Sequence, residues 1–272
     1  SLINEKKNDL ANIKKITNKN HESNQILNSI INDITTNTSH KLFDLYCQQT
    51  YLDNLLRGGY PLIFKGEEQD KVIHLYIRKH GDQERDYNWF YLEPNYFSQG
   101  NGNFRDVNQN RRCDVWFHPQ VKDFNVKTFM NLIQADGFNP LVITGTTFRL
   151  PENKIKSIIP LVENPESIRE FLSKSFTVGE LIKFIRLNKV DLNGTIDNFL
   201  KKTLYFAEQT INAVYGQGYW IDHWTYNLDL IENYLSIYPD GKYSLFFEDK
   251  SYTFYDTHVG VKPRQDKYVL VK

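Results

Sequence analysis

The sequence predicts a mainly α-helical protein whose chemically reactive side chains lie in the segments between helices. Most of the chain places apolar residues at three-and-four spacing, and these stretches begin at capping residues or prolines and end at glycines. Roughly eight helices, interrupted by two β-hairpins, are expected on these signals. A chain of 272 residues can bury one large core, so a single main domain is possible.

The first part of the chain predicts two helices followed by a hairpin. The first helix covers residues 2–35, and the second runs from a cap at Thr38 or Ser39 to a stop at Gly58 and Gly59. The runs YPLIF and KVIHLYIRKH, joined by the polar turn KGEEQD, form the predicted hairpin. We expect residues 1–37 to be a helical linker and residues 38–272 to form the main domain.

The second part of the chain predicts further helices and a second hairpin. In chain order we expect a helix over 121–137 after Pro119, a loop or short strand over 144–160, helices from Pro165, over 177–187 and over 195–214, and a helix with Leu228, Ile231 and Leu235 on one side. The run YSLFFEDKSYTFYD at 243–256 is expected to form the second hairpin, and PRQDKYVLVK ends on a strand.

The overall charge and composition argue against several classes of protein. Lys plus Arg and Asp plus Glu both total 33, which gives a formal net charge of zero and argues against a nucleic-acid partner. No apolar run reaches a membrane-spanning length, and the polar start SLINEKKNDL does not resemble a signal peptide. Cys47, Cys113 and the seven histidines lack metal-ligand spacing, so we predict free thiols, no metal, no organic cofactor and a cytoplasmic location.

The aromatic content is the unusual feature of the composition. The chain contains 17 Tyr, 18 Phe and 4 Trp, and many of the Tyr and Trp residues stand beside Asp, Asn, Arg and Gln. Flat apolar faces next to planar hydrogen-bonding groups suit a carbohydrate ligand. Burial of these rings in the core, with their polar atoms hydrogen bonded, is the alternative interpretation.

The most conspicuous cluster is Trp220, Asp222, His223 and Trp224, at the start of a predicted helix. A tryptophan can hold a sugar ring, and an apolar wall can keep a carboxylic acid protonated near neutral pH. The alternative is structural, with Asp222 as the helix cap and the two tryptophans in the core.

Three other clusters of polar side chains are candidate ligand contacts. Arg105, Asp106, Asn108 and Gln109 carry fixed hydrogen-bonding geometry suited to a polyhydroxyl ligand, although an exposed helix start with internal Arg–Asp pairs is the alternative. The two weaker candidates are Arg85 with Asp86, in what could be a solvated hairpin turn, and Arg57 with Tyr60, where Arg57 could instead form a local ion pair with Asp53.

The runs GNFRDVNQNRR and GYWIDHW, in this order, resemble the catalytic domain of the inverting β-glycoside phosphorylases, which include cellobiose, chitobiose, laminaribiose and β-glucan phosphorylases. The first run is similar to the Arg-Asp-x-Asn-Gln-Asp motif of that group, and the second to its Trp-x-Asp motif. YLDNLLRGGYP, RKHGDQERDYN and LIQADGFNPL are also similar to segments of its larger members. The resemblance covers residues 51–238 in patches.

The resemblance implies an (α/α)6 barrel, of the six-hairpin type, with β-hairpins in its loops. It implies that Asp222 is the general acid, while Trp220, His223 and Trp224 line the sugar pocket with Arg105, Asp106, Asn108 and Gln109; Arg57, Tyr60, Arg85 and Asp86 are further substrate contacts. Two positions depart from the motif. Asn110 replaces its final Asp, a contact that Asp114 could supply, and His223 stands where several members carry a second acid.

We therefore predict the catalytic part of a phosphorylase that cleaves a β-glucan or β-linked disaccharide with inorganic phosphate. A phosphorylase needs one acid, whereas an inverting hydrolase needs an acid and a base. A non-catalytic carbohydrate-binding relative and an inverting hydrolase of the same fold are the alternatives. Because the chain ends soon after Asp222, we expect a portion of a larger enzyme, inactive alone, with its barrel incomplete, its phosphate contacts elsewhere and any homodimer formed through other domains.

Overall fold

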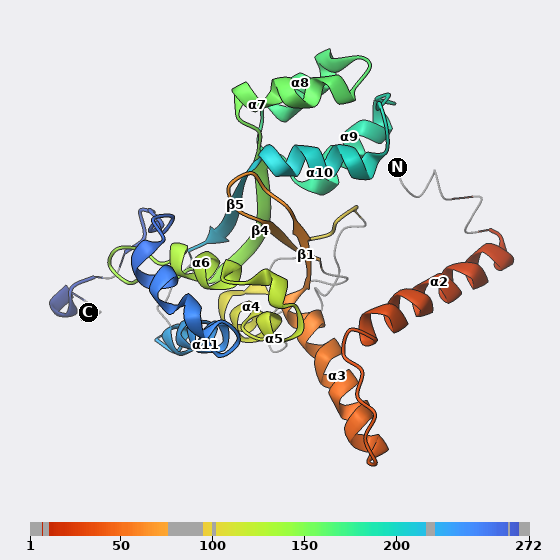
Figure 1. Ribbon diagram of the computed structural model, residues 1–272. Helices are drawn as coiled ribbons and strands as arrows, with labels where there is room; N and C mark the ends of the chain where they lie inside the picture. Colours follow the sequence, from red (N-terminus) through yellow and green to blue (C-terminus); the bar gives the residue numbers. More distant parts are fainter. Residues whose placement is uncertain are drawn as a thin grey trace, which may run out of the picture. The chain divides into compact units, whose positions relative to one another are not determined.

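The structure, a computed structural model, describes residues 7, 11–75, 95–99, 102–215, 221–260 and 262–266. The chain divides into two compact units, residues 1–53 and residues 54–272. Figure 1 labels the helices and strands of both units. This division falls later than the boundary predicted at residues 37 and 38.

The first unit contains helix α2 (Ile13–Ile31) and most of helix α3 (Lys41–Gly58). Oδ1 of Asn12 accepts hydrogen bonds from the backbone N–H groups of Lys14 (3.0 Å) and Lys15 (3.3 Å), which caps α2. Helix α3 begins close to the predicted position, with Lys41 as its first residue, but the predicted cap is not formed: Oγ1 of Thr38 accepts from the N–H of His40, which precedes the helix, and the N–H of Thr38 donates to the Asp44 carboxylate.

The second unit begins where α3 ends, and the predicted first hairpin is confirmed there. Strands β1 (Tyr60–Phe64) and β2 (Lys71–Leu75) pair antiparallel, from Tyr60 opposite Leu75 to Phe64 opposite Lys71. The turn between them requires a glycine, because a Cβ at Gly66 would stand 2.0 Å from the carbonyl oxygen of Gln69.

A second sheet has the order β3 (Gly102–Asn103), β4 (Val142–Arg149), β5 (Glu208–Val214), with antiparallel pairs. The prediction of one helix over 195–214 is wrong in its second half, because helix α10 (Ile196–Phe206) ends and β5 follows. The prediction of a loop or short strand over 144–160 is also incomplete. That segment forms most of β4, then helix α7 (Glu152–Ile158) and the 3-10 turn η2 (Ile159–Leu161).

Four helices gather at one end of β4 and β5 (Figure 1), namely α7, α8 (Pro165–Leu172), α9 (Val178–Leu187) and α10. The predicted starts of α8 and α9 are confirmed, and Thr177 and Glu180 form a capping box at α9. Their inward faces join residues of the sheets in what we call the apolar cluster: Ile73, Phe148, Leu150, Ile155, Ile158, Val162, Ile168, Leu172, Phe176, Val178, Leu181, Ile182, Ile185, Phe199, Leu200, Leu204 and Ala207.

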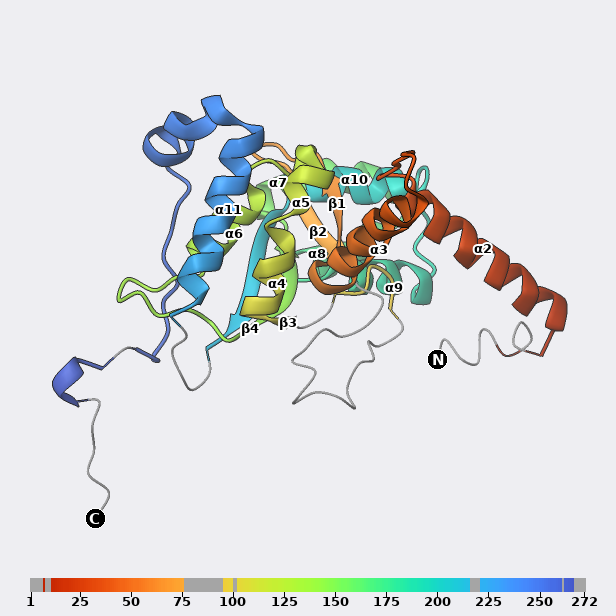
Figure 2. The same cartoon turned by 90° about the horizontal axis from the view of Figure 1, so that it is seen from below.

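A second group of helices packs at the other end of the same strands: α4 (Phe104–Arg111), α5 (Asp114–Phe117), α6 (Phe124–Asn131) and α11 (His223–Ile237), with the 3-10 turn η1 (Pro119–Val121) between α5 and α6. Figure 2 shows α11 beside α4 and α6, which it contacts. The apolar residues buried here are Phe104, Val107, Val126, Phe129, Leu132, Ile143, Leu230 and Leu245. The helix predicted over 121–137 is shorter in the structure, because α6 covers Phe124–Asn131 only.

Two expectations for the C-terminal part are wrong at least in part. Helix α11 buries His223, Asn227 and Leu230; of the predicted apolar side, Ile231 packs against the buried apolar residues, whereas Leu228 is 52% exposed. The 3-10 turn η3 (Pro239–Gly241) follows α11, and the hairpin predicted over 243–256 is replaced by a π-helical turn, η4 (Ser244–Glu248), and a segment without strands. A further 3-10 turn, η5 (Arg264–Asp266), follows, and residues 267–272 of the predicted last strand lie outside the described residues.

The protein is mainly helical with small sheets, in agreement with the mainly α class that the sequence predicts. None of the helices within the described residues has the length and apolar character needed to cross a membrane.

Candidate functional site

The two runs singled out in the sequence meet along helices α4 and α11. The ring of Phe104 stacks on the ring of His223, with centroids 4.7 Å apart. One turn further along each helix, Nδ2 of Asn108 donates to Oδ1 of Asn227 at 2.7 Å. Because successive turns of α4 contact successive turns of α11 in the same order, the two helices are parallel and their N-termini lie at the same end.

The pairing continues at the other end of these helices. Arg112 forms an ion pair with Asp229, and the backbone carbonyl of Arg112 accepts a hydrogen bond from Nδ2 of Asn233 at 3.0 Å. Nε1 of Trp116, on α5, donates to Oδ1 of the same Asn233 at 3.0 Å. The relative register of α4 and α11 is therefore fixed over their whole contact, which fixes the residues at their N-termini.

Asp222 occupies the N-terminal position of α11, but its side chain makes no capping hydrogen bond. Its burial is intermediate, between that of the exposed Ile221 and the buried His223. The structural alternative, in which this carboxylate caps the helix, is thus not what the structure shows. Across the interface, Nε of Arg105 lies 3.7 Å from Oδ1 of Asp106, and the Arg105 side chain is largely exposed.

His223 connects the two charged residues electrostatically. Burial lowers the pKa of His223 to about 4, while the Asp222 carboxylate opposes this shift and the Arg105 guanidinium reinforces it. Both charges therefore act on one imidazole ring, which is neutral near pH 7. The structure thus brings Asp222 and Arg105, which are far apart in sequence, to the same end of the helix pair.

The prediction of direct sugar contacts by His223 and Asn108 is corrected by their burial. His223 is 3% exposed against Phe104, and Asn108 is fully buried against Asn227. Both side chains are therefore turned into the helix interface. Within the part of the chain that the structure describes, Nδ1 of His223, Oδ1 of Asn108 and Nδ2 of Asn227 have no hydrogen-bond partner.

Trp224 links this end of the helices to the LIQADGFNPL run. Its indole is 40% exposed, and its Cζ2 atom lies 3.7 Å from the position that a Cβ of Gly137 would occupy. Gly137 has φ +84°, in the left-handed region that favours glycine. A half-exposed aromatic ring thus stands in the first turn of α11, two residues after Asp222, and is packed against a turn whose backbone favours glycine.

Asp114 does not supply the sugar contact that was predicted for it. It is 1% exposed, and its Oδ2 atom lies 2.8 Å from both Nε2 of His74 and Nδ2 of Asn125. Burial raises the pKa of Asp114 to about 7, against the hydrogen bond from Asn125 and the positive charge of Arg111. Nε of Arg111 donates to the carbonyl of Gly58 at 2.8 Å, so this buried network joins the ends of α3 and α4 to β2, α5 and α6.

The remaining predicted residues are distributed around these helices. Asp106 and Gln109 are partly exposed on α4, and Arg57 is partly exposed at the end of α3. The ring of Tyr60 meets the ring of His118 edge-on, with centroids 5.3 Å apart. The other predicted contacts, Arg85, Asp86 and Trp220, lie outside the described residues.

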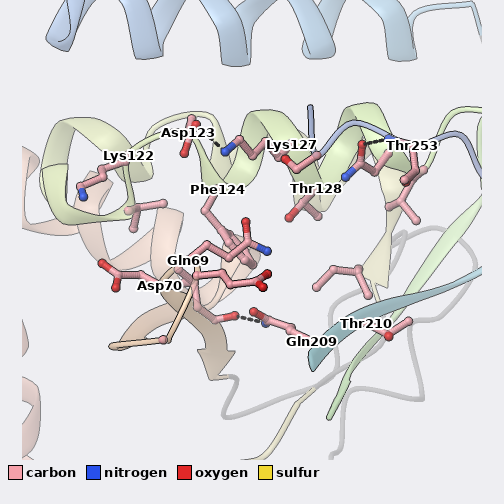
Figure 3. A pocket seen from close by; sticks show the side chains of 18 of the residues that line it. Gln69, Asp70, Lys122, Asp123, Phe124, Lys127, Thr128, Gln209, Thr210 and Thr253 are labelled. Carbon is pink, nitrogen blue, oxygen red and sulfur yellow. Dashed lines mark hydrogen bonds and ion pairs between the residues drawn. The ribbon is translucent and has the colours of Figure 1, made fainter. Parts of the chain in front are cut away.

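The sequence prediction missed a polar pocket of about 560 Å³ (Figure 3), which shares none of the predicted site residues. It is lined by the turn after β1, by the segment from Gln120 to Leu132, by β5 and by residues 251–255. No local motif marks this pocket, because four separate stretches of the chain each contribute one wall.

Within the described residues, no group of three or more His, Cys, Asp or Glu side chains is arranged to hold a metal ion. Comparison of the chain with protein-family models, curated proteins and solved structures finds no match.

Proposed function

We propose that the N-terminal end of α4 and α11 is the cleavage site of an inverting glycoside phosphorylase. The substrate is a β-glucan or β-linked disaccharide, and inorganic phosphate converts it to α-glucose 1-phosphate. The observation that carries the proposal is that Arg105, Asp222 and Trp224, from the two separate runs, lie at one end of two parallel helices. The (α/α)6 barrel belongs to the same proposal.

Asp222 acts as the general acid. Its carboxyl group donates a proton to the glycosidic oxygen as the bond from this oxygen to the anomeric carbon breaks, and the bonding electrons leave with the oxygen. A phosphate oxygen attacks the anomeric carbon from the opposite face, which inverts its configuration. The carboxylate left on Asp222 is reprotonated from solvent. Such an acid is worth ~10²–10⁴-fold in rate.

The surroundings of Asp222 suit this chemistry. Trp224 offers a half-exposed ring as a platform for the sugar. The N-termini of two parallel helices carry partial positive charge, and Arg105 adds a full charge at the same end. An attacking phosphate is favoured at such a place, whereas a water molecule would require a second carboxylate as base.

A non-catalytic carbohydrate-binding protein is the second candidate, and the burial of Asn108 and His223 favours it. At Asn110, the position that departs from the motif, Nδ2 donates to the backbone carbonyl of Asp106 at 2.7 Å. Three positions of the two runs are thus used inside the protein. Such a protein would bind a glucan without releasing phosphate from α-glucose 1-phosphate.

An Asp222→Asn variant of the intact protein that contains this chain separates the candidates. We expect phosphate release from α-glucose 1-phosphate and a panel of acceptor sugars to fall by ~10²–10⁴-fold, because the amide cannot donate the required proton. Asp240→Asn, on the exposed η3 turn, is the matched control and should keep full activity. Unchanged turnover in Asp222→Asn contradicts the phosphorylase, and sugar binding without turnover in the unmodified intact protein supports the second candidate.

A further inference from the structure

The polar pocket between β1–β2, α6 and β5 has a shape and lining of its own. Figure 3 shows Gln69 and Asp70 from the turn after β1, Lys122 to Thr128 from the α6 segment, and Gln209 and Thr210 from β5, arranged around one space. Its volume of about 560 Å³ is within the range of small-ligand sites. None of the residues of the proposed cleavage site lines it.

The walls of this pocket are held by bonds within the protein. Nε2 of Gln209 donates to the carbonyl of Val72 at 2.7 Å, which ties β5 to β2. Oδ1 of Asn131 accepts from the N–H of Thr253 at 2.9 Å, which ties residues 251–255 to α6. The glycine at position 66 is required by the turn that forms the third wall. The pocket is therefore largely formed before any ligand enters.

The charges that line the pocket compensate one another. Nζ of Lys65 lies 2.9 Å from Oδ2 of Asp70. Nζ of Lys127 lies 2.9 Å from Oδ2 of Asp123 and 2.6 Å from Oδ2 of Asp249. Lys122 and Glu68 add one further charge of each sign to the lining. With no excess of positive charge, the pocket is poorly suited to a phosphorylated or otherwise anionic ligand.

The uncharged lining matches a ligand with many hydroxyl groups. Amide side chains provide both donors and acceptors in fixed planes, and hydroxyl side chains provide either, as a saccharide needs. The apolar part of the lining can cover the C–H faces of a sugar ring. The amide and hydroxyl residues are Gln69, Gln120, Thr128, Asn131, Gln209, Thr210, Ser251 and Thr253, and the apolar residues include Val72, Phe124 and Ile211.

Lys122 stands at the pocket in a backbone conformation that a lysine adopts at an energetic cost. Its φ of +51° and ψ of −129° belong to a region dominated by glycine in tight turns. Strained residues of this kind cluster at sites of ligand binding. The ammonium group carries three donors, which can serve hydroxyl oxygens.

We infer that this pocket is a binding site for a neutral oligosaccharide, with Lys122 and Gln69 among its contacts. It is separate from the cleavage site, and the inference holds whether or not that site is catalytic. In a protein that acts on a glucan, it would hold a second stretch of the same or another sugar chain.

The test measures calorimetric binding of linear glucotetraoses with α-1,4, β-1,4 and β-1,3 linkages to the full chain. An Arg105→Ala, Trp224→Ala background removes contacts at the cleavage site. In this background Lys122→Gly should weaken binding of at least one tetraose by about tenfold or more, because a charged donor is lost. The same variant should melt at a higher temperature than the parent, since glycine relieves the backbone.

Lys189→Gly is the matched control, because Lys189 has φ +49° but lies at the end of α9 and does not line the pocket. It should leave binding unchanged. A second pair is Gln69→Ala, expected to weaken binding several-fold, and Gln49→Ala, on an exposed position of α3, expected to have no effect. The inference is overturned if no tetraose binds at millimolar concentration, if both lysine variants bind equally well, or if inorganic phosphate or a neutral tetrapeptide occupies the pocket instead.

Discussion

The helices around the apolar cluster and the helices around the two sequence runs belong to one unit but differ in what they bury. Among the residues that α7, α8, α9 and α10 bury, Thr203 is the polar one. Helices α4, α5, α6 and α11 bury seven polar or charged residues: Asn108, Arg111, Asp114, Asn125, Thr128, His223 and Asn227. We call this second set, with the apolar residues packed around it, the mixed cluster.

The difference teaches which half of the unit has a task beyond folding. A buried polar group lowers stability unless its hydrogen bonds are made, and an apolar interior avoids that cost. The apolar cluster shows that this sequence can build such an interior. Under the proposed function, Asn108, Asn227 and His223 of the mixed cluster serve to position Asp222 and Arg105.

The largest expected effect comes from the apolar cluster. Phe176 is fully buried between Phe148 and Phe171, so Phe176→Ala should lower the free energy of unfolding by about 3–5 kcal/mol. Urea denaturation measures the change. Phe247→Ala, at a position that is 62% exposed, is the control and should change stability by less than about 0.5 kcal/mol. Equal effects would mean that the buried cluster is not the core.

The second prediction concerns the buried carboxyl of the mixed cluster. The pKa of Asp114 is about 7 in the folded protein and near 4 in the unfolded chain. The native state thus keeps a proton that the unfolded state releases, so this group's contribution to stability is present below pH 4 and is lost as pH rises toward 7. The pKa of His74, lowered well below its usual value by burial, acts in the opposite direction.

An Asp114→Asn variant isolates this contribution, because His74 remains. We expect the stability of the unmodified protein, relative to Asp114→Asn, to fall by a few kcal/mol between pH 4 and pH 7. Urea denaturation at several pH values measures the difference. If the stability difference between the unmodified protein and Asp114→Asn does not change with pH, the Asp114 carboxyl has the same pKa in the folded and unfolded states. Burial in the mixed cluster would then not perturb this carboxyl.

The fold could be predicted from the sequence where the signals are local. The Thr177–Glu180 capping box, the proline that opens α8 and the polar turn between β1 and β2 act over a few residues, and these elements were found. The sequence alone predicts a helix where β5 lies, because the conformation of β5 depends on pairing with β4, more than fifty residues earlier in the chain. Propensity carries no information about such a distant partner.

The site was predictable only in part for the same reason. The run from Arg105 to Asn110 suggests neighbouring sugar contacts, but α4 turns Val107, Asn108 and Arg111 to its buried face and leaves Arg105 exposed beside that face. The face of α11 was misjudged because its inward residues, His223 and Asn227, are polar and match polar or aromatic partners on α4. The pocket near Lys122 needed the tertiary structure.

The third prediction tests whether the buried amides serve stability or position. Asn108→Ala leaves Oδ1 of Asn227 buried without its donor, which should cost about 1–3 kcal/mol in the free energy of unfolding. Replacing both residues with leucine removes both polar groups and should restore most of that loss. If the two buried amides serve to position Asp222 and Arg105, the double variant should fold well but lose sugar binding at the proposed cleavage site. Retained binding would contradict the positioning role.

The smallest expected change in stability comes from two glycines, one near the helices of the mixed cluster and one near the helices of the apolar cluster. Gly137, which lies against Trp224 of α11, has φ +84°. Gly194, between α9 and α10, has φ +128°, and a Cβ added there would meet open space. Alanine at either position should cost about 1–2 kcal/mol, because both backbones lie where a Cβ is disfavoured. The contact at Gly137 is with Trp224 at an ordinary van der Waals separation, so no large steric clash is added.

The two variants should therefore differ in what they disturb rather than in how much stability they lose. Gly137→Ala shifts the turn beneath Trp224 and should change the fluorescence of that indole, seen as the difference from the same variant carrying Trp224→Phe. Gly194→Ala should leave that difference spectrum as it is in the unmodified protein. Equal difference spectra for the two variants would mean that the turn at Gly137 does not hold the Trp224 ring in place. The helices of the mixed cluster would then lack one of the contacts that distinguish them from the helices of the apolar cluster.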